Sequence, residues 1–425
     1  MVLRRTIGNL IDPMPQDHPQ RSSAIFTASE ESDLGSPAPR QASEAARVDV
    51  RPLRGWRDRA RFVALPYRLH RKDTNWVPPL RRDIHKSISR RHNPFFEHGD
   101  ACFWLAWRNG VPVGRISAQI NQLHLSIHRD ETGNIGMLEA IDDPAVFAAL
   151  LRTAEGWLRE RGMRRVLGPY SLSINDEIGI LITGFESPPM IGMPYTPPYY
   201  AARLEAEGYR KAKDLHALRV VLADAVPQRF NQIDRITAQL RADGRLGVRF
   251  LEPEHFADEI RLGLDIYNEA WAANWGFVPV TGREVNHLID QLAPIVPREC
   301  VVFALADGEA AAMLVAMPNI NEFLADLDGR LFPIGWLKLL WRLRFRKVKS
   351  ARIALAGIRR RYAGSGISTA LLTLMLASIV KTGQAANIET VELSWILEDN
   401  KPSLEGCYAL GGRLAKVYRI FSKRL

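Results

Sequence analysis

The feature that most constrains the fold of this chain is an internal duplication. The stretch "VRPLRGWRDRARFVALPYRLHRKDTNWVPP" and the later stretch "VRFLEPEHFADEIRLGLDIYNEAWAANWGFVP" each read as a short strand, a helix and an Asn-Trp turn that ends in proline. Two further motifs, a glycine-turn hairpin and a Gly-x-Arg-x-Ala-Lys segment, also occur twice and in the same order. The matching pairs are Val50–Pro79 with Val248–Pro279, Asn109–Ile120 with Asp307–Met317, and Glu207–Asp214 with Leu410–Val417. Three matches in one order predict two copies of one α/β unit, separated near residue 225.

The length of the chain supports this division. Its 425 residues are enough for two domains, each with its own core. We expect an N-terminal unit over residues 46–225 and a C-terminal unit over residues 226–425, each with a mixed central sheet flanked by helices. Residues 1–45 are rich in Pro, Ser, Asp, Glu and Gln and poor in large apolar side chains, which predicts a disordered tail.

Charge and cysteine content limit the partners and the compartment. A net charge of +10 predicts an anionic partner, and it leaves open nucleic acid, a phosphate-bearing cofactor or an acidic membrane surface. Three cysteines without metal-ligand spacing (Cys102, Cys300 and Cys407) indicate a reducing cytosol rather than a disulfide framework. The first residues lack the apolar core of a signal peptide. The longest apolar run, Gly366–Val380, is shorter than the roughly 20 residues of a bilayer span, so we expect a buried helix.

One motif points to a specific chemistry. In "IALAGIRRRYAGSGISTALLTLML" (Ile353–Leu376) an apolar strand leads into Arg361-x-x-Gly364-x-Gly366, and a long apolar helix follows. Glycines at such a turn let the backbone approach a ligand, and the helix N-terminus adds a partial positive charge. The turn therefore suits a pyrophosphate, although a plain tight turn with a helix cap is the competing interpretation.

The first copy lacks this turn. At the corresponding place, "EAIDDPAVFAALLRTAEGWLRERG" (Glu139–Gly162) has Asp142-Asp143-Pro144 and no glycine before the helix. Carboxylates at a helix N-terminus satisfy the dipole and repel phosphate. We expect only the C-terminal copy to keep a pyrophosphate loop, and the first copy to shape the acceptor site.

These motifs resemble the GNAT superfamily of acyl-CoA-dependent N-acyltransferases. The family's Arg/Gln-x-x-Gly-x-Gly/Ala loop is matched at Arg361, Gly364 and Gly366, and its Asn-turn-Tyr-Gly element at Asn400, Tyr408 and Gly411-Gly412. The resemblance implies an acyl-CoA co-substrate and makes Tyr408 the acid that protonates the departing thiolate. Tyr408 lies one residue further from Asn400 than is usual in the family.

Longer segments narrow the resemblance over residues 46–425. Four segments look like a bacterial tandem-GNAT group that includes the bacterial ceramide synthases, which acylate the amine of a sphingoid base. They are Arg91–His98, Val113–Asn121, Gly168–Pro189 and Tyr267–Pro279. The resemblance implies a long-chain acyl-CoA donor and a long-chain amine acceptor.

An insertion precedes the strand of the phosphate loop. Within residues 321–350, the stretch "LFPIGWLKLLWRLRFRKVK" places Trp336 and Leu340 on an apolar helix face and Arg342 on a basic one. This pattern fits a helix at the headgroup boundary of an anionic membrane, and a helix packed on its own domain is the alternative. We therefore expect a cytoplasmic protein that associates peripherally with the inner membrane.

The resemblance also assigns a cofactor site. In GNAT proteins the strand before the loop offers backbone N–H groups to the pantetheine and the thioester carbonyl, and here that strand ends at Ile358. The residues expected to bind acyl-CoA are Ala356, Gly357, Ile358, Arg359, Arg361, Ala363, Gly364, Ser365, Gly366, Ile367 and Asn400. No metal site is expected.

Deprotonation of the acceptor ammonium needs a general base. Glu398 and Asp399 follow the strand nearest the cofactor, and they serve equally well as a turn and helix cap. We expect a second group of residues to bind the acceptor, with structural roles as the alternative for each. These are His98, Asn175, Asp176, Glu177, Asn274 and Trp275.

Three other functions compete with sphingoid-base acylation. One is a tandem GNAT that transfers an acyl or aminoacyl group to an amino acid, a peptide or a cell-wall precursor. Another is a non-catalytic acyl-CoA sensor. A nucleic-acid binder, suggested by the charge, lacks any helix-turn-helix, zinc or RNP-type signature.

Overall fold

The computed structural model describes residues 47–223, 235, 238, 239, 242, 244–292 and 297–425. The predicted tail and the predicted boundary near residue 225 lie outside these residues. The first copy contains β1 (Asp49–Pro52), α1 (Gly55–Leu69), α2 (Arg81–Ser87), a 3-10 helix (Pro94–Glu97), β2 (Gly99–Arg108), β3 (Val111–Asn121), α3 (Gln122–His128), β4 (Thr132–Ala140), α4 (Pro144–Arg159), β5 (Arg165–Gly168), β6 (Ile180–Thr183), α5 (Tyr199–Ala206) and β7 (Arg210–Val221).

The second copy follows the same order, except that α9 and α10 stand where the first copy has α3 and that its described residues include no counterpart of β6. It contains β8 (Leu246–Phe250), α7 (Phe256–Trp271), α8 (Gly282–Leu292), β9 (Val301–Ala306), β10 (Glu309–Pro318), α9 (Asn321–Leu324), α10 (Gly335–Phe345), β11 (Ser350–Ile358), α11 (Gly366–Ala385), β12 (Thr390–Leu397), α12 (Lys401–Ala409) and β13 (Arg413–Arg424). The duplication predicted from the sequence is thereby confirmed.

Local geometry repeats as well. The β2–β3 hairpin turns at Asn109-Gly110 with φ of 51° and 74°, and the β9–β10 hairpin turns at Asp307-Gly308 with φ of 50° and 84°. Two successive positive φ values define the type I′ turn, for which Asn-Gly and Asp-Gly are the favoured sequences.

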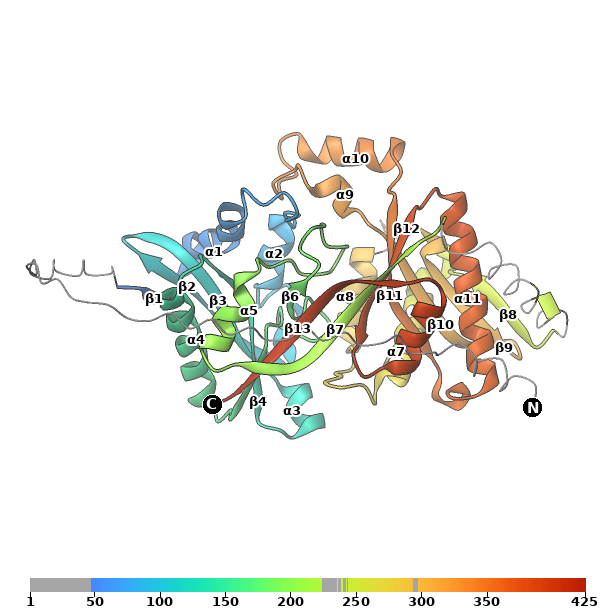
Figure 1. Cartoon of the computed structure of the whole chain (residues 1–425), viewed down its shortest axis with the longest axis horizontal. Coiled ribbons are helices and arrows are strands. Elements are labelled where there is room, and N and C mark those ends of the chain that lie inside the picture. Colours follow the sequence, from blue (N-terminus) through green and yellow to red (C-terminus); the bar gives the residue numbers. More distant parts are fainter. Residues whose placement is uncertain (1–46, 224–234, 236–237, 240–241, 243, 293–296) are drawn as a thin grey trace, which may run out of the picture. The chain divides into compact units, whose positions relative to one another are not determined.

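The two copies share one sheet and exchange their last strands. The strand order is β1-β2-β3-β4-β5-β13-β7-β12-β11-β10-β9-β8, with β6 also paired to β13. β13, the end of the second copy, pairs with β5 of the first copy. β7, the end of the first copy, pairs with β12 of the second (Figure 1). β7 and β13 also pair with each other from Arg210 to Arg219, so backbone hydrogen bonds run without a break from one copy to the other.

Helices cover both faces of the second copy. α11 packs Leu371 and Met375 against β9 and β10, and α7 packs Ile266 and Tyr267 on the opposite face. Among the described residues, α11 alone is long and apolar enough to cross a membrane, and one face of it is buried against the sheet through Leu371, Leu374, Met375 and Ile379. The helix expected from Gly366–Val380 is therefore present and continues to Ala385.

Candidate active site

β11 and β12 run parallel and then separate. They pair from Ser350 with Thr390 to Ile353 with Leu393, while β11 stays paired with β10 as far as Ile358. The edge of residues 355–358 that faces away from β10 is therefore free of a neighbouring strand. The predicted cofactor residues Ala356, Gly357 and Ile358 lie on this open stretch.

The predicted phosphate turn lies directly after β11 and opens α11. Gly364 has a φ of +70°, which favours glycine, and no heavy atom lies within 4 Å of the Cβ position of either Gly364 or Gly366. Ser365 is the N-cap residue of α11, yet its hydroxyl donates to the Tyr362 carbonyl at 2.5 Å and does not cap the helix. The first N–H groups of α11 therefore face open space at the positive end of a 20-residue helix.

The arginines before the turn have different partners. The guanidinium of Arg359 donates to Glu269 at 2.6 Å and to Asp265 at 2.8 Å, both on α7, and so ties the turn to that helix. Arg361 pairs with Glu309 at 2.5 Å and remains half exposed, so a phosphate can compete for it. Arg359 thus positions the turn, while Arg361 remains available to a ligand.

Aromatic side chains line the place where the strands separate. The indole Nε1 of Trp271 donates to the Ala356 carbonyl at 2.9 Å. The Trp271 ring lies 5.3 Å from that of Trp395 on β12 and 5.1 Å from that of Tyr267. These rings offer an apolar wall beside the strand on which the resemblance places a thioester.

In the first copy the chain itself fills the equivalent gap. β4 and β5 pair only from Thr132 to Asn134, and the segment after β5 then folds back. The Tyr170 N–H donates to the Ile135 carbonyl at 2.7 Å, and a Cβ at Gly136 would lie 1.4 Å from the Tyr170 oxygen. No space for a pantetheine arm remains between these strands.

The helix start of the first copy is also unsuited to phosphate. The Asp143 carboxylate accepts hydrogen bonds from the N–H groups of Ala145 and Val146 at 2.8 and 3.3 Å. It also pairs with Arg108 at 2.7 Å, and this hydrogen bond lowers the pKa of Asp143. A fixed negative charge therefore occupies the position that the glycine turn leaves open in the second copy.

The two carboxylates predicted as general bases are both paired with lysines of β7. Glu398 lies 2.5 Å from the Lys211 ammonium and also accepts from the Asp214 N–H. Asp399 pairs with Lys213 at 2.8 Å, and that hydrogen bond lowers the pKa of Asp399. A lowered pKa makes a carboxylate a weaker base.

The remaining predicted residues around the turn lie on or beside α12. Tyr408 is 47% exposed on this helix, and Asn400 caps it by accepting from the Ser403 N–H. Among the described residues, no group of three or more His, Cys, Asp or Glu side chains is arranged to hold a metal ion.

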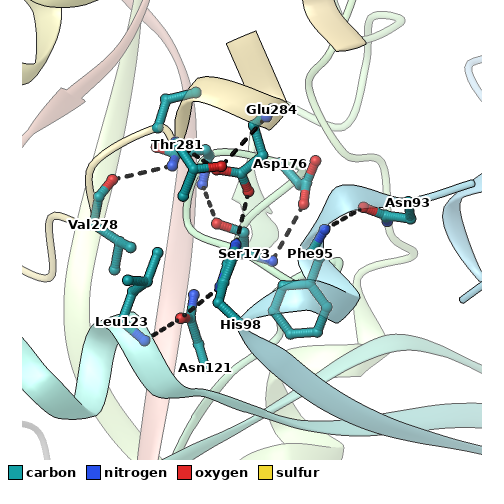
Figure 2. Close-up of polar contacts among 12 residues, drawn as sticks. Asn93, Phe95, His98, Asn121, Leu123, Ser173, Asp176, Val278, Thr281 and Glu284 are labelled. Carbon is teal, nitrogen blue, oxygen red and sulfur yellow. Dashed lines mark hydrogen bonds and ion pairs between the residues drawn. The ribbon is translucent and has the colours of Figure 1, made fainter. Parts of the chain in front are cut away.

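His98 joins the two copies. Its Nε2 lies 3.2 Å from a Glu284 oxygen on α8, and its Nδ1 lies 3.3 Å from the Asn121 oxygen (Figure 2). The hydrogen bond to Glu284 raises the pKa of His98. Burial alone would raise the pKa of Glu284, but hydrogen bonds from His98 and Thr281 outweigh it and lower that pKa. Both shifts favour a protonated His98 paired with an ionised Glu284.

Glu284 was not identified from the sequence. Thr281-x-x-Glu284 reads as a capping box, and the structure contains that box, with the Thr281 N–H donating to Glu284 at 2.8 Å. Nothing in one sequence links this helix cap to a histidine 186 residues earlier.

Asn175, Asp176 and Glu177 lie on the loop after β5, next to this pair. Asn175 donates to the Val278 carbonyl at 3.1 Å and accepts from the Tyr267 hydroxyl at 3.0 Å. All three side chains are exposed to solvent, yet desolvation by the surrounding protein raises the pKa of Glu177 and raises that of Asp176 to about 7. The hydrogen bond that Asp176 accepts comes from the Ser173 N–H at 3.2 Å (Figure 2).

The Asn-Trp turns have architectural contacts in both copies. The Asn274 N–H donates to the Trp271 carbonyl, and the Trp275 ring lies 5.8 Å from the Lys213 ammonium. In the first copy, Asn75 donates to the Phe185 carbonyl and Trp76 packs against Tyr67. Both tryptophans are partly buried against the core around Tyr418.

Two known proteins are similar in sequence to most of the chain. No protein-family model matches the chain. It is 39% identical over 384 residues to a protein of Caulobacter vibrioides (strain NA1000 / CB15N) named bacterial ceramide synthase, covering 90% of this chain and 99% of that protein. It is also 39% identical over 377 residues to Protein YghO of Escherichia coli (strain K12), covering 88% of this chain and 95% of that protein.

A solved structure supports the same fold. The tandem GNAT protein from the clavulanic acid biosynthesis pathway, solved without AcCoA, aligns with a TM-score of 0.51 and 13% identity. The alignment covers 89% of this chain and 98% of that one. At this identity the likeness shows the fold alone.

Proposed function

The chain belongs to the bacterial ceramide synthase family of tandem GNAT N-acyltransferases, and we propose that it transfers the acyl group of a long-chain acyl-CoA to the amine of a sphingoid base. The observation that carries the proposal is the open glycine turn at Gly364–Gly366, next to the point where β11 and β12 separate. The first copy has a carboxylate and its own backbone at these places, so one acyl-CoA would bind per chain.

The residues present fit an acyl-CoA. The first N–H groups of α11 and the guanidinium of Arg361 would hold the diphosphate. The pantetheine arm would lie along Ala356–Ile358, whose outer edge has no strand neighbour. The rings of Trp271 and Trp395 would then contact the acyl chain.

A sphingoid base carries an amine and hydroxyl groups on an apolar tail, and the site offers matching surfaces. Asn175, Asp176 and Glu177 are exposed polar groups, and Asn175 is held by the hydroxyl of Tyr267, whose ring lies beside that of Trp271. The amine would thus lie near the carboxylates while the tail follows the aromatic rings. Such an acceptor resides in a bilayer, so we place the reaction at the cytoplasmic face of the inner membrane.

Among the carboxylates of this region, Asp176 is the best placed to accept the ammonium proton. Glu398 and Asp399 each pair with a lysine, and Glu284 pairs with His98, whereas the hydrogen-bond partner of Asp176 is a backbone N–H. A base with a pKa near the working pH is also the most effective in general-base catalysis. We therefore assign the base to Asp176 in preference to Glu398 and Asp399.

Asp176 takes one proton from the ammonium and passes it to water, and the amine nitrogen then attacks the thioester carbon. The C–S bond breaks as the new C–N bond forms, and the second proton on nitrogen is lost to water. The leaving thiolate takes a proton from Tyr408, which recovers one from water. Holding the two reactants together lowers the activation barrier by several kcal/mol.

Turnover on a panel of amines tests the proposal. Purified full-length protein would be incubated with long-chain acyl-CoA and either a sphingoid base, amino acids or a cell-wall peptide, with thiol release and product mass measured. We expect an N-acyl long-chain base as the product. Thiol release that requires an amino acid or a peptide instead would overturn the acceptor assignment.

A further inference from the structure

The insertion between β10 and β11 exposes an unusual number of large apolar side chains. Phe332 is 80% exposed, Phe345 65% and Leu340 58%. The other exposed apolar residues of this segment are Ile334, Trp336, Leu337, Trp341 and Leu343. No residue of α10 is buried. Contiguous apolar patches of this kind mark surfaces that contact another molecule.

The direction in which this surface faces is set by one carboxylate. Arg342 donates to Asp326 at 2.6 and 2.8 Å and to the Phe323 carbonyl at 2.6 Å, and Lys338 also pairs with Asp326. These hydrogen bonds hold the pKa of Asp326 well below its usual range. The charged side of α10 is therefore turned towards α9, and its apolar side is turned outwards. Arg342, which we predicted to contact a membrane, serves as an anchor of the helix.

The segment that carries α10 is also tied to the first copy. The Arg81 N–H donates to the Gly329 carbonyl at 3.0 Å, and its guanidinium donates to Asp328 at 2.8 Å. The same guanidinium stacks 3.9 Å above the Tyr67 ring. These contacts fix the base of the insertion, and α10 extends beyond the sheet (Figure 1).

The charge of the segment identifies its partner. Residues 329–349 contain seven Lys or Arg residues and no Asp or Glu. Arg344, Arg346 and Lys347 are exposed, and within the described part of the chain none of them pairs with a carboxylate. An apolar face bordered by unpaired cations complements an anionic lipid surface. A second copy of the chain is a poorer match, because a two-fold contact would bring the same cations together.

We infer that residues 332–345 form the surface through which this protein docks on an anionic lipid bilayer, with the apolar face of α10 lying in the headgroup boundary. The inference rests on the proposed function, in which the acceptor is a membrane lipid.

Vesicle binding by matched variants tests the inference. The substitutions Trp336→Glu and Leu340→Glu together place two charges on the outward face without touching the Asp326 anchor. As a control, Val111→Glu and Ile127→Glu change two residues of similar exposure elsewhere. A third variant, Arg344→Gln with Arg346→Gln and Lys347→Gln, removes the unpaired cations only.

Sedimentation would use vesicles of phosphatidylcholine with and without phosphatidylglycerol. For the double Glu variant we expect partitioning to fall on the order of 100-fold, since two apolar side chains no longer enter the boundary. For the triple Gln variant we expect a loss of about fivefold per residue on anionic vesicles and little change on neutral ones. The control should bind as the wild type does.

Two outcomes would overturn the inference. One is unchanged vesicle binding by the double Glu variant. The other is a wild-type dimer that this variant converts to monomers, which would assign the face to a second copy. Activity on an acceptor dissolved in detergent micelles distinguishes a failure of this inference from a failure of the proposed function. The docking variants should keep that activity, whereas a chain that does not acylate amines would show none.

Discussion

Replacing Ser365 by aspartate would copy the helix start of the first repeat onto the second. Ser365 is the N-cap of α11, and Asp143 is the N-cap of α4, where its carboxylate accepts two backbone hydrogen bonds. Serine and aspartate are about equally good N-caps, and a negative charge at this end adds roughly 0.3–1 kcal/mol to helix stability. The Ser365→Asp variant should therefore fold at least as well as the wild type.

Binding of acyl-CoA should change in the opposite direction. A carboxylate about 4 Å from one diphosphate charge costs about 1 kcal/mol when screened as in water, and about 4 kcal/mol at the effective dielectric of a protein surface. Ser365 is exposed, so the cost lies between these limits. We expect Ser365→Asp to bind acyl-CoA about 10- to 100-fold more weakly, since 1.4 kcal/mol corresponds to a factor of ten.

The assay is a calorimetric titration with CoA and with acyl-CoA at low salt, alongside a thermal melt of each variant. Ser365→Asn is the matched control, because asparagine caps a helix without a charge and should keep most of the affinity. Wild-type affinity in the aspartate variant would refute the assignment of the diphosphate to this turn. Equal weakening in both variants would show that the hydroxyl, and not the charge, matters.

Three further results are expected. Asp176→Asn should lower kcat/KM by about 10²–10⁴-fold. Because Asp176 is a carboxylate above its pKa of about 7, the activity of the wild type should rise as the pH increases through 7. The same rise in activity in the Asn variant would contradict the assignment of the base. The full chain should unfold in one calorimetric transition, since β13 pairs with β5 and β7; two separate transitions would mean that the copies fold independently. Leu371→Ala, on the buried face of α11, should destabilise the fold by about 2–5 kcal/mol in denaturant titrations, and a change below 1 kcal/mol would mean that this face of the helix is not part of the core.

The parts of the fold that local sequence determines were the predictable parts. The type I′ hairpins at Asn109 and Asp307 and the glycine turn at Gly364 depend on a few neighbouring residues and their allowed φ values. The exchange of β7 and β13 does not depend on neighbouring residues, because either strand would satisfy the same hydrophobic pattern beside β5 or β12. Pairing of this kind is decided by long-range contacts that one sequence does not display.

The site was predictable only where its residues adjoin in sequence. The ion pairs of Glu398 and Asp399 could not be predicted, since their lysine partners on β7 lie in the other copy. The pairing of His98 with Glu284 spans both copies in the same way. For α10, the pattern predicted two faces, but only the contact with Asp326 shows which of them turns inwards.

A structure of the protein with a non-hydrolysable long-chain acyl-CoA analogue is the most direct test of the central claim. We predict one ligand per chain, with its diphosphate against the N–H groups at Gly364–Gly366, its pantetheine arm beside Ala356 and its acyl chain against Trp271. A diphosphate bound at the start of α4, or at any place away from α11, would contradict it.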